Sequence, residues 1–201
     1  MSVFEHWPNR ITALRFIGAF VLFGMLSVVG EGGPSQNMGL IQGSFWLFVV
    51  VVSTDFLDGY LARRDNQVST FGRIADPFVD KVLILGALIY LAVLPWSRPW
   101  VPVWGVVLIL SREFLVTGIR GWVESTGREF GADGLGKIKM VLQSIAVGGV
   151  LFLHAFPWPE ELFHYLSWMA HALIWGTIGI TLISGVSYVL KTRTLIEELN
   201  S

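Results

Sequence analysis

The segment from Asp55 to Asp80 reads DFLDGYLARRDNQVSTFGRIADPFVD and contains two sets of regularly spaced acidic and small residues. The first set stands at positions i, i+3, i+4 and i+7, which is one face of an α-helix; it consists of Asp55, Asp58, Gly59 and Ala62. The second set repeats every four residues on a second helix and consists of Gly72, Asp76 and Asp80. If the two helices lie antiparallel, all four carboxylates converge on one small volume.

Four carboxylates in one small volume favour a metal site. They would repel one another at a membrane edge unless divalent cations neutralised them. Oxygen ligands suit Mg²⁺, Mn²⁺ or Ca²⁺, whereas zinc prefers histidine and cysteine. Any one aspartate near a helix end could instead cap the helix or face solvent. The joint spacing, with Gly59 and Gly72 on the same faces, favours the metal interpretation because glycine lets backbone or ligand approach closely.

The composition is that of an integral membrane protein. The chain has 201 residues, of which 53% are hydrophobic and 14% charged, and its net charge is −1. We therefore expect one transmembrane domain over residues 1–201 and no recruitment of nucleic acid. The absence of cysteine excludes disulfides and a cysteine-based zinc site. The first apolar run, after Arg10 and Arg15, lacks a small-residue cleavage site and is interpreted as a retained helix.

The apolar segments predict an all-α protein with a bundle of six transmembrane helices. They have spanning length and lie at about 11–29, 39–62, 74–95, 100–123, 136–156 and 164–190. We interpret Gly32–Ser35, Pro95–Pro99 and Pro157–Glu161 as turns. With alternating sides, 13 of the 14 lysine and arginine residues fall on one side and Arg98 alone on the other. The positive-inside rule then places both termini and the acidic cluster on the cytoplasmic side.

A second group of candidate site residues is basic and lies on the same, cytoplasmic side. It consists of Arg112, Arg120, Lys137 and Lys139. Arg112 and Arg120 lie within an apolar segment, where a charge is costly and usually functional. The two lysines follow glycines at the start of a helix, a position suited to a phosphate. The alternative is that these basic residues only set the membrane topology or contact lipid headgroups. Glu113 could likewise pair with Arg120 simply to neutralise it.

The acidic segment resembles the signature of the CDP-alcohol phosphotransferase family, D-x2-D-G-x2-A-R-x8-G-x3-D-x3-D, and matches it at every specified position. A narrower resemblance to the bacterial phosphatidylglycerophosphate synthases rests on three other runs. These are Pro8–Arg15, Ser111–Trp122 with its Arg112-Glu113 pair and Arg120, and Gly136–Lys139. One departure is Asp133, an acid beside the lysines.

The resemblance implies an enzyme that displaces CMP from CDP-diacylglycerol by an acceptor hydroxyl, here that of glycerol 3-phosphate. Two divalent cations, Mg²⁺ or Mn²⁺, would be held by Asp55, Asp58, Asp76 and Asp80, with Asp80 also the general base. The CDP-lipid would be bound by Asn9, Thr12, Gly59, Ala62, Arg63, Ser69 and Gly72. The acceptor phosphate would be bound by Arg112, Arg120, Lys137 and Lys139. The resemblance also implies a homodimer, contact with membrane lipids and a place in the bacterial inner membrane.

Two alternatives remain open from the sequence. A sister enzyme of the family would use inositol phosphate, serine or a second lipid as acceptor. A divalent-cation transporter, which belongs to another class, would use the acids as a transit site. A transporter should carry ionisable groups near the middle of the membrane and an exit on the far side. The outer half of this chain lacks such groups, and Gly59, Arg63 and Gly72 would have no role.

Overall fold

The computed structural model describes residues 7–65, 70–127 and 134–199, and within them the side chains of residues 9–54, 75–127 and 134–193. This part of the chain is all-α and contains no strand, as the sequence predicts. The helices are α1 (Trp7–Val29), α2 (Gly33–Gln36), α3 (Met38–Asp65), α4 (Thr70–Val93), α5 (Val103–Ser125), α6 (Gly134–Ala155) and α7 (Glu160–Leu199).

The six long helices coincide with the six apolar segments, and their ends differ in two informative places. The Gly32–Ser35 stretch, expected as a turn, overlaps the short helix α2. Pro34 lies in the first turn of α2, where its fixed φ suits a helix and its missing N–H has no partner to lose. Helix α7 is 40 residues long and extends beyond residue 190, so its apolar part continues into a polar C-terminal extension.

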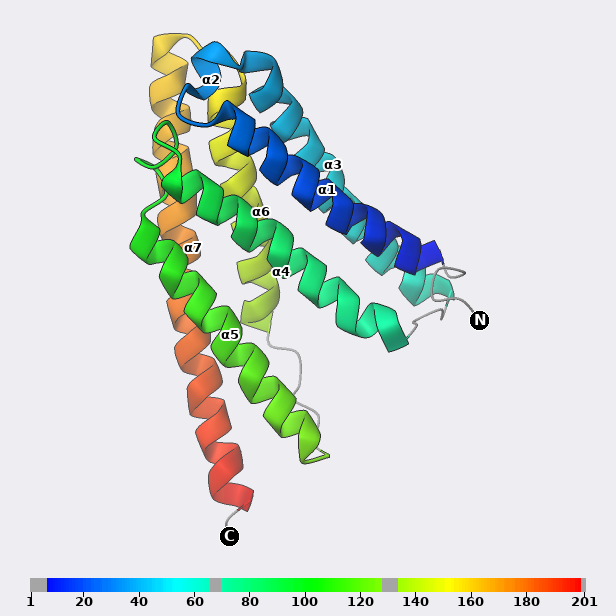
Figure 1. Ribbon diagram of the computed structural model, residues 1–201. Coiled ribbons are helices and arrows are strands. Elements are labelled where there is room, and N and C mark those ends of the chain that lie inside the picture. The colour runs from blue at the N-terminus through cyan, green and yellow to red at the C-terminus, as the bar shows by residue number, and fades with distance from the viewer. Residues whose placement is uncertain (1–6, 66–69, 128–133, 200–201) are drawn as a thin grey trace.

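The helices pack most closely at one end of the bundle. Helix α1 packs on α3 and α4, while α6 packs on α3, α4 and α7, and α5 packs on α4 and α7. Figure 1 shows the helices close together at the end that carries α2 and diverging toward the opposite end, near which the two chain ends lie. At the closed end, the imidazole of His154 contacts the indoles of Trp96 and Trp100, with ring centroids 5.0 and 4.8 Å away.

Helices α1 and α4 approach each other closely because a glycine lies at their contact. A β-carbon on Gly86 of α4 would overlap the ring of Phe23 on α1. Small residues allow this kind of close packing between helices in a membrane. The contact fixes α1 against α4, and these two helices also carry the polar pairs of the site described below.

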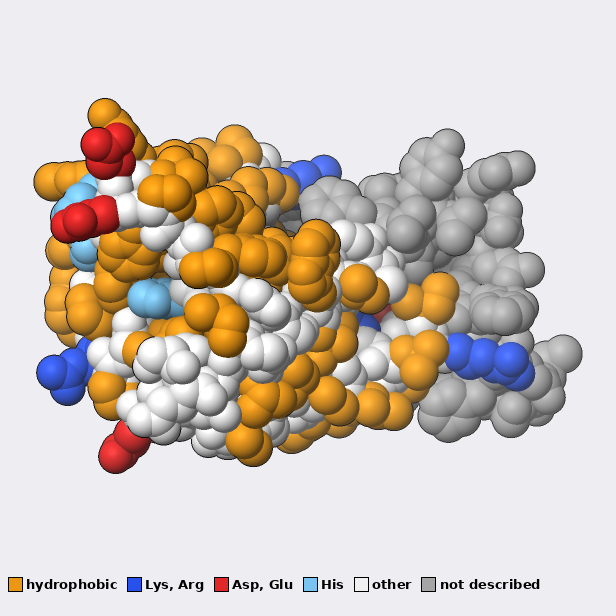
Figure 2. Space-filling model, turned by 90° about the horizontal axis from the view of Figure 1, so that it is seen from above, with side chains coloured by type: hydrophobic (Ala, Val, Ile, Leu, Met, Phe, Trp, Pro, Cys, Tyr) orange, Lys and Arg blue, Asp and Glu red, His pale blue; other side chains and the backbone are white. Residues whose placement is uncertain are grey.

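The outer surface is strongly apolar, as expected for a protein in lipid. Large hydrophobic side chains are exposed on every long helix, among them Phe20, Trp46, Phe114, Trp168 and Ile183. Figure 2 shows hydrophobic side chains over much of the described part of the face that it presents, with few charged side chains. Three helical segments of the described chain are long and apolar enough to cross a membrane: Asn9–Val29, Gly134–Ala155 and Glu160–Arg193. The chain is therefore a membrane protein.

Candidate active site

Helix α1 supplies a partner for each of the two described aspartates. Thr12 donates a hydrogen bond from its hydroxyl to Oδ1 of Asp76. Arg15 donates from Nη1 to Oδ1 of Asp80 over 2.7 Å. Thr12 and Arg15 are one turn apart on α1, and the two acids are one turn apart on α4, so the pairs form in the same order along both helices. The N-terminal halves of α1 and α4 therefore run side by side and in the same direction.

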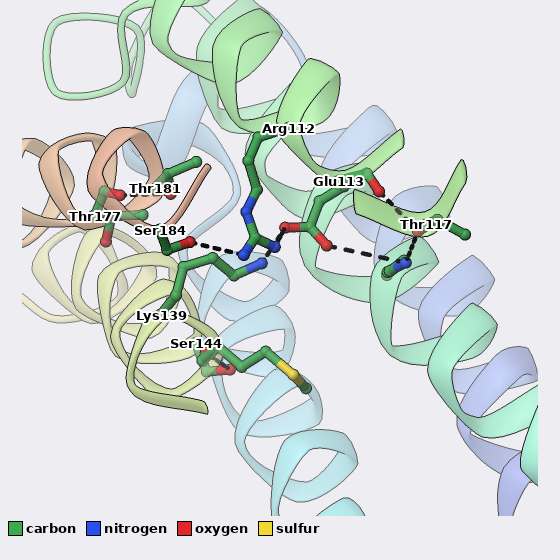
Figure 3. Close-up of polar contacts among 10 residues, drawn as sticks. Arg112, Glu113, Thr117, Lys139, Ser144, Thr177, Thr181 and Ser184 are labelled. Carbon is green, nitrogen blue, oxygen red and sulfur yellow. Dashed lines mark hydrogen bonds and ion pairs between the residues drawn. The ribbon is translucent and has the colours of Figure 1, made fainter. Parts of the chain in front are cut away.

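A second polar group surrounds the carboxylate of Glu113 on α5. Lys139 of α6 and Arg112 of α5 both contact Oε1, the latter over 3.1 Å, and Lys81 of α4 lies 4.0 Å from Oε2. Figure 3 shows Arg112 and Lys139 on the same side of the Glu113 carboxylate, where both reach one of its oxygens. Three cations thus meet one anion, which leaves an excess of two positive charges. We call Lys81, Arg112, Glu113 and Lys139 the Glu113 cluster.

Further hydrogen bonds hold the Glu113 cluster in place. Arg112 donates from Nη2 to the Ser184 hydroxyl of α7 over 2.7 Å. Lys81 donates to the hydroxyl of Thr117, which itself donates to the backbone carbonyl of Glu113 over 2.7 Å. Lys139 has a side chain that is only 3% exposed and Arg112 one that is 8% exposed. The guanidinium and the ammonium are consequently fixed by protein partners rather than free in solvent.

Arg15, Asp76 and Asp80, together with the Glu113 cluster, line one cavity of about 570 Å³, which we call the central cavity. It lies between α1, α4, α5 and α6, with contributions from Val52 of α3 and Tyr188 of α7. Its charged lining residues are Arg15, Asp76, Asp80, Lys81, Arg112, Glu113, Arg120, Glu124, Lys137 and Lys139. On α1, α4 and α6 these residues lie toward the N-terminus, and on α5 toward the C-terminus, so the cavity lies toward the diverging end of the bundle.

All four predicted acceptor-binding residues line the central cavity, but they differ in exposure. Arg112 and Lys139 are buried within the Glu113 cluster, whereas Arg120 and Lys137 are exposed. The alternative in which Glu113 pairs with Arg120 is not what the described residues show. The two share a face by spacing, but Glu113 pairs with Arg112, Lys139 and Lys81 instead. Arg120 lies about two turns further along α5, and Lys139 reaches Glu113 from the helix opposite.

The predicted CDP-lipid residues fall into two groups. Asn9 and Thr12 are buried on α1, at 2% and 3% exposure, and Thr12 contacts Asp76. The remaining ones were expected on or beside the acidic segment. Gly59, Ala62 and Arg63 belong to the last turns of α3 and Gly72 to the first turn of α4, but their side-chain environment lies outside the described residues, as does Ser69 altogether.

The described half of the predicted metal site fits divalent cations. Asp76 and Asp80 offer carboxylate oxygens one turn apart at the wall of the central cavity, which is the donor type that Mg²⁺ and Mn²⁺ use. The side chains of Asp55 and Asp58 lie outside the described residues. Among the side chains that are described, no group of three or more histidine, cysteine, aspartate or glutamate residues could hold a metal ion. The convergence of all four aspartates therefore stays a prediction.

Several residues of the cavity wall were not among the predicted site residues. Arg15 and Lys81 are charges in otherwise apolar segments, a signal that could have marked them as functional. Gln143, which is 4% exposed, left no comparable signal because an uncharged polar residue in a spanning segment is unremarkable in composition. Its position on the cavity wall follows from the packing of α6 against α3 and α4.

Paired carboxylates facing a set of cations inside a helical membrane protein define a class of site suited to phosphoryl transfer. The family comparison gives the particular family: residues 5–183 match the model of the CDP-alcohol phosphatidyltransferases, and the chain belongs to this family. Members of this family generally use divalent cations.

Three curated relatives illustrate the similarity. The chain is 36% identical to the CDP-diacylglycerol–glycerol-3-phosphate 3-phosphatidyltransferase of Bacillus subtilis, over 96% of this chain and 98% of that protein. It is 31% identical to the Rickettsia felis protein of the same name, over 94% and 96% of the two chains. It is 34% identical to a probable phosphatidylglycerophosphate synthase of Mycobacterium tuberculosis, over 91% and 79%.

Proposed function

We propose that the protein transfers the phosphatidyl group of CDP-diacylglycerol to glycerol 3-phosphate, giving phosphatidylglycerophosphate and CMP. Relatives that match nearly the whole length of the chain carry the name of this activity. The observation that carries the proposal is the central cavity, in which Asp76 and Asp80 share one space with Arg112, Arg120, Lys137 and Lys139. A phosphorylated acceptor needs cations of its own, in addition to the metals that would serve the diphosphate.

The charge of the Glu113 cluster supports an acceptor with a phosphate. Its excess of two positive charges would be balanced by a phosphate monoester that carries about two negative charges near neutral pH. Arg120 and Lys137 on the same wall would add further charged contacts to that phosphate. Serine, with no phosphate, would leave these cations uncompensated inside a partly buried cavity, which costs free energy. The proposal therefore favours glycerol 3-phosphate over serine, and inositol phosphate has to be separated from it by experiment.

The reaction assigns a role to each set of residues. Two divalent cations, Mg²⁺ or Mn²⁺, would be held by Asp55, Asp58, Asp76 and Asp80 and, when bound, supply neutralising charge at the diphosphate. The acceptor hydroxyl gives its proton to the carboxylate of Asp80 and its oxygen bonds to the phosphatidyl phosphorus. The bond from that phosphorus to the CMP oxygen breaks, and CMP leaves with the electron pair. Arg15 would orient the Asp80 carboxylate for the proton transfer through its hydrogen bond to Oδ1.

The remaining assignments concern binding and placement. The CDP-lipid would contact Asn9, Thr12, Gly59, Ala62, Arg63, Ser69 and Gly72, with its acyl chains in the bilayer between the helices. All six long helices would cross the bacterial inner membrane as one domain over residues 1–201, with the cavity on the cytoplasmic side. We further propose a homodimer. The coincidence of the long helices with the apolar segments supports the six spans. The charge asymmetry of the loops supports the orientation, and the family supports the homodimer.

The test is a product analysis with a panel of acceptors. Purified protein in lipid nanodiscs would receive CDP-diacylglycerol, Mg²⁺ or Mn²⁺, and one of glycerol 3-phosphate, inositol phosphate or serine, and the lipid products would be identified by mass spectrometry. We expect phosphatidylglycerophosphate and one equivalent of CMP from glycerol 3-phosphate alone. Asp80→Asn serves as the inactive control. A lipid product formed only from inositol phosphate or only from serine would overturn the proposed acceptor and leave the family reaction intact.

A further inference from the structure

Gln143 has a buried side-chain amide that points to a ligand of the central cavity. The residue is 4% exposed and lines the cavity. Its Nε2 is buried and has no hydrogen-bond partner among the described residues. A buried donor without a partner costs free energy, so native proteins keep one where something else, such as a ligand, satisfies it.

The position of Gln143 places it where the reacting end of the acceptor would lie. It follows Lys139 by four residues on the buried face of α6, and the next residues on that face are Ala146 and Val147. Gln143 is thus the last polar side chain on this face before the apolar core. Asp80 on α4 and Gln143 on α6 both lie about 14–15 Å along their helices from the termini at the diverging end, and α4 packs on α6. Gln143 and the proposed base therefore line the same cavity, about equally far along two helices that pack on each other.

The chemistry of the amide selects a neutral hydroxyl as its partner. The phosphate of the acceptor has the basic residues of the cavity, and the attacking hydroxyl at C1 has Asp80. The hydroxyl at C2 of glycerol 3-phosphate is the remaining polar group, and it enters the same enclosed space. An amide can both donate to and accept from a hydroxyl, which matches this group. Removing the C2 hydroxyl from water without a partner would be costly.

We infer that Gln143 binds the C2 hydroxyl of the acceptor and so makes the enzyme select glycerol 3-phosphate over acceptors that lack this group. This inference rests on the proposed function and adds a specificity-determining residue to it. It concerns a contact with the substrate rather than the fold, because the ligand-free protein leaves the amide donor without a described partner.

The experiment compares two acceptors in two enzymes. Glycerol 3-phosphate is compared with 3-hydroxypropyl phosphate, which lacks only the C2 hydroxyl, in the wild type and in Gln143→Met, a variant of similar length without an amide. We expect Gln143→Met to lower kcat/KM for glycerol 3-phosphate about tenfold. We expect kcat/KM for 3-hydroxypropyl phosphate to stay unchanged, so the preference between the two acceptors shrinks by the same factor. The KM for CDP-diacylglycerol should not move.

Two controls separate binding from a structural role. Gln36→Met makes the same substitution at an exposed position of α2, which does not line the central cavity, and should leave both acceptors unaffected. Thermal unfolding without substrate should show Gln143→Met to be at least as stable as the wild type, since it removes an unsatisfied buried donor. A second variant, Gln143→Leu, repeats the kinetics with a different side-chain shape.

The outcomes distinguish this inference from the proposed function. An equal fall for both acceptors, no fall for either, or a wild type that does not distinguish them would overturn the role of Gln143. A clear loss of thermal stability in both variants would also overturn it, because the amide would then serve the fold. A wild type that forms no lipid product from glycerol 3-phosphate would overturn the proposed function itself.

Discussion

Arg15 of α1 lies 2.7 Å from Asp80 of α4, nitrogen Nη1 to oxygen Oδ1, although 64 residues separate them in the chain. The Arg15 side chain is 1% exposed and that of Asp80 is 16% exposed, so the pair is largely shielded from water. The carboxylate that we propose as the base is therefore oriented from a helix that carries none of the four signature aspartates. This relationship gives the first prediction.

Replacing Arg15 should impair both the fold and the reaction. Arg15→Met leaves Asp80 without its cation, and breaking a buried pair by removing one partner costs about 3–5 kcal/mol of stability. We expect a lower thermal unfolding midpoint and at least a tenfold lower kcat in the fraction that stays folded. Arg98→Met, an exposed position between α4 and α5, is the control and should change stability by less than about 0.5 kcal/mol. Normal kcat in folded Arg15→Met would contradict a role for this pair in the reaction.

The two lysines of α6 should differ in what they do. Lys139 is 2% exposed and bonded to Glu113, whereas Lys137 is exposed on the same cavity. Lys139→Ala should therefore cost about 3–5 kcal/mol of stability. Lys137→Ala should leave stability nearly unchanged and raise the KM for glycerol 3-phosphate roughly tenfold to a hundredfold, the value of one charge-assisted contact. Unfolding curves and acceptor titrations on both variants test this division, and equal stability losses would refute it.

Removing the single anion of the Glu113 cluster should make the protein depend on an added anion. Glu113→Gln leaves Lys81, Arg112 and Lys139 without their counter-charge, so the ligand-free variant should unfold at a lower temperature than the wild type. Glycerol 3-phosphate should raise the unfolding midpoint of the variant by more than that of the wild type, because it restores negative charge. Glycerol, which lacks the phosphate, is the matched control. A shift of equal size in both proteins would count against the cluster as part of the phosphate site.

The aspartates should separate proton transfer from metal binding. Asp80→Asn should lower turnover by about a hundredfold or more, the usual share of general acid–base catalysis, while CDP-diacylglycerol binding stays measurable. Asp76→Asn and Asp55→Asn should also weaken Mg²⁺ binding, and EDTA should abolish the activity of the wild type. Activity titrated against Mg²⁺ and against CDP-diacylglycerol tests each variant. Near-normal turnover of Asp80→Asn at saturating Mg²⁺ would refute the base assignment.

The orientation in the membrane can be tested by labelling, because the natural chain has no cysteine. Single cysteines at Ser69 and Ser125 should react with a membrane-impermeant reagent only from the cytoplasmic side. One at Ser35, in α2, should react only from the outside. Labelling of position 69 in intact cells would contradict the orientation derived from the basic residues.

The sequence by itself determined the helices and the class of chemistry. Apolar segments of spanning length predicted the six long helices, because in lipid the backbone must satisfy its own hydrogen bonds. The spacing of Asp76 and Asp80 predicted that they share a helical face, since residues four apart always do. The signature predicted the family, which the comparison confirmed. The position of Asp55 and Asp58 relative to them stays a prediction.

Only the tertiary structure decided which residues meet across helices. Spacing along one helix suggested that Glu113 pairs with Arg120, yet the carboxylate contacts Lys139 of another helix, 26 residues away. The partners Thr12 and Arg15 of the two acids, and the place of Gln143 on the cavity wall, were likewise set by how α1 and α6 pack on α4. The physical reason is that helical periodicity fixes which side chains share a face, whereas the helix that covers this face is selected by the packing of the whole bundle.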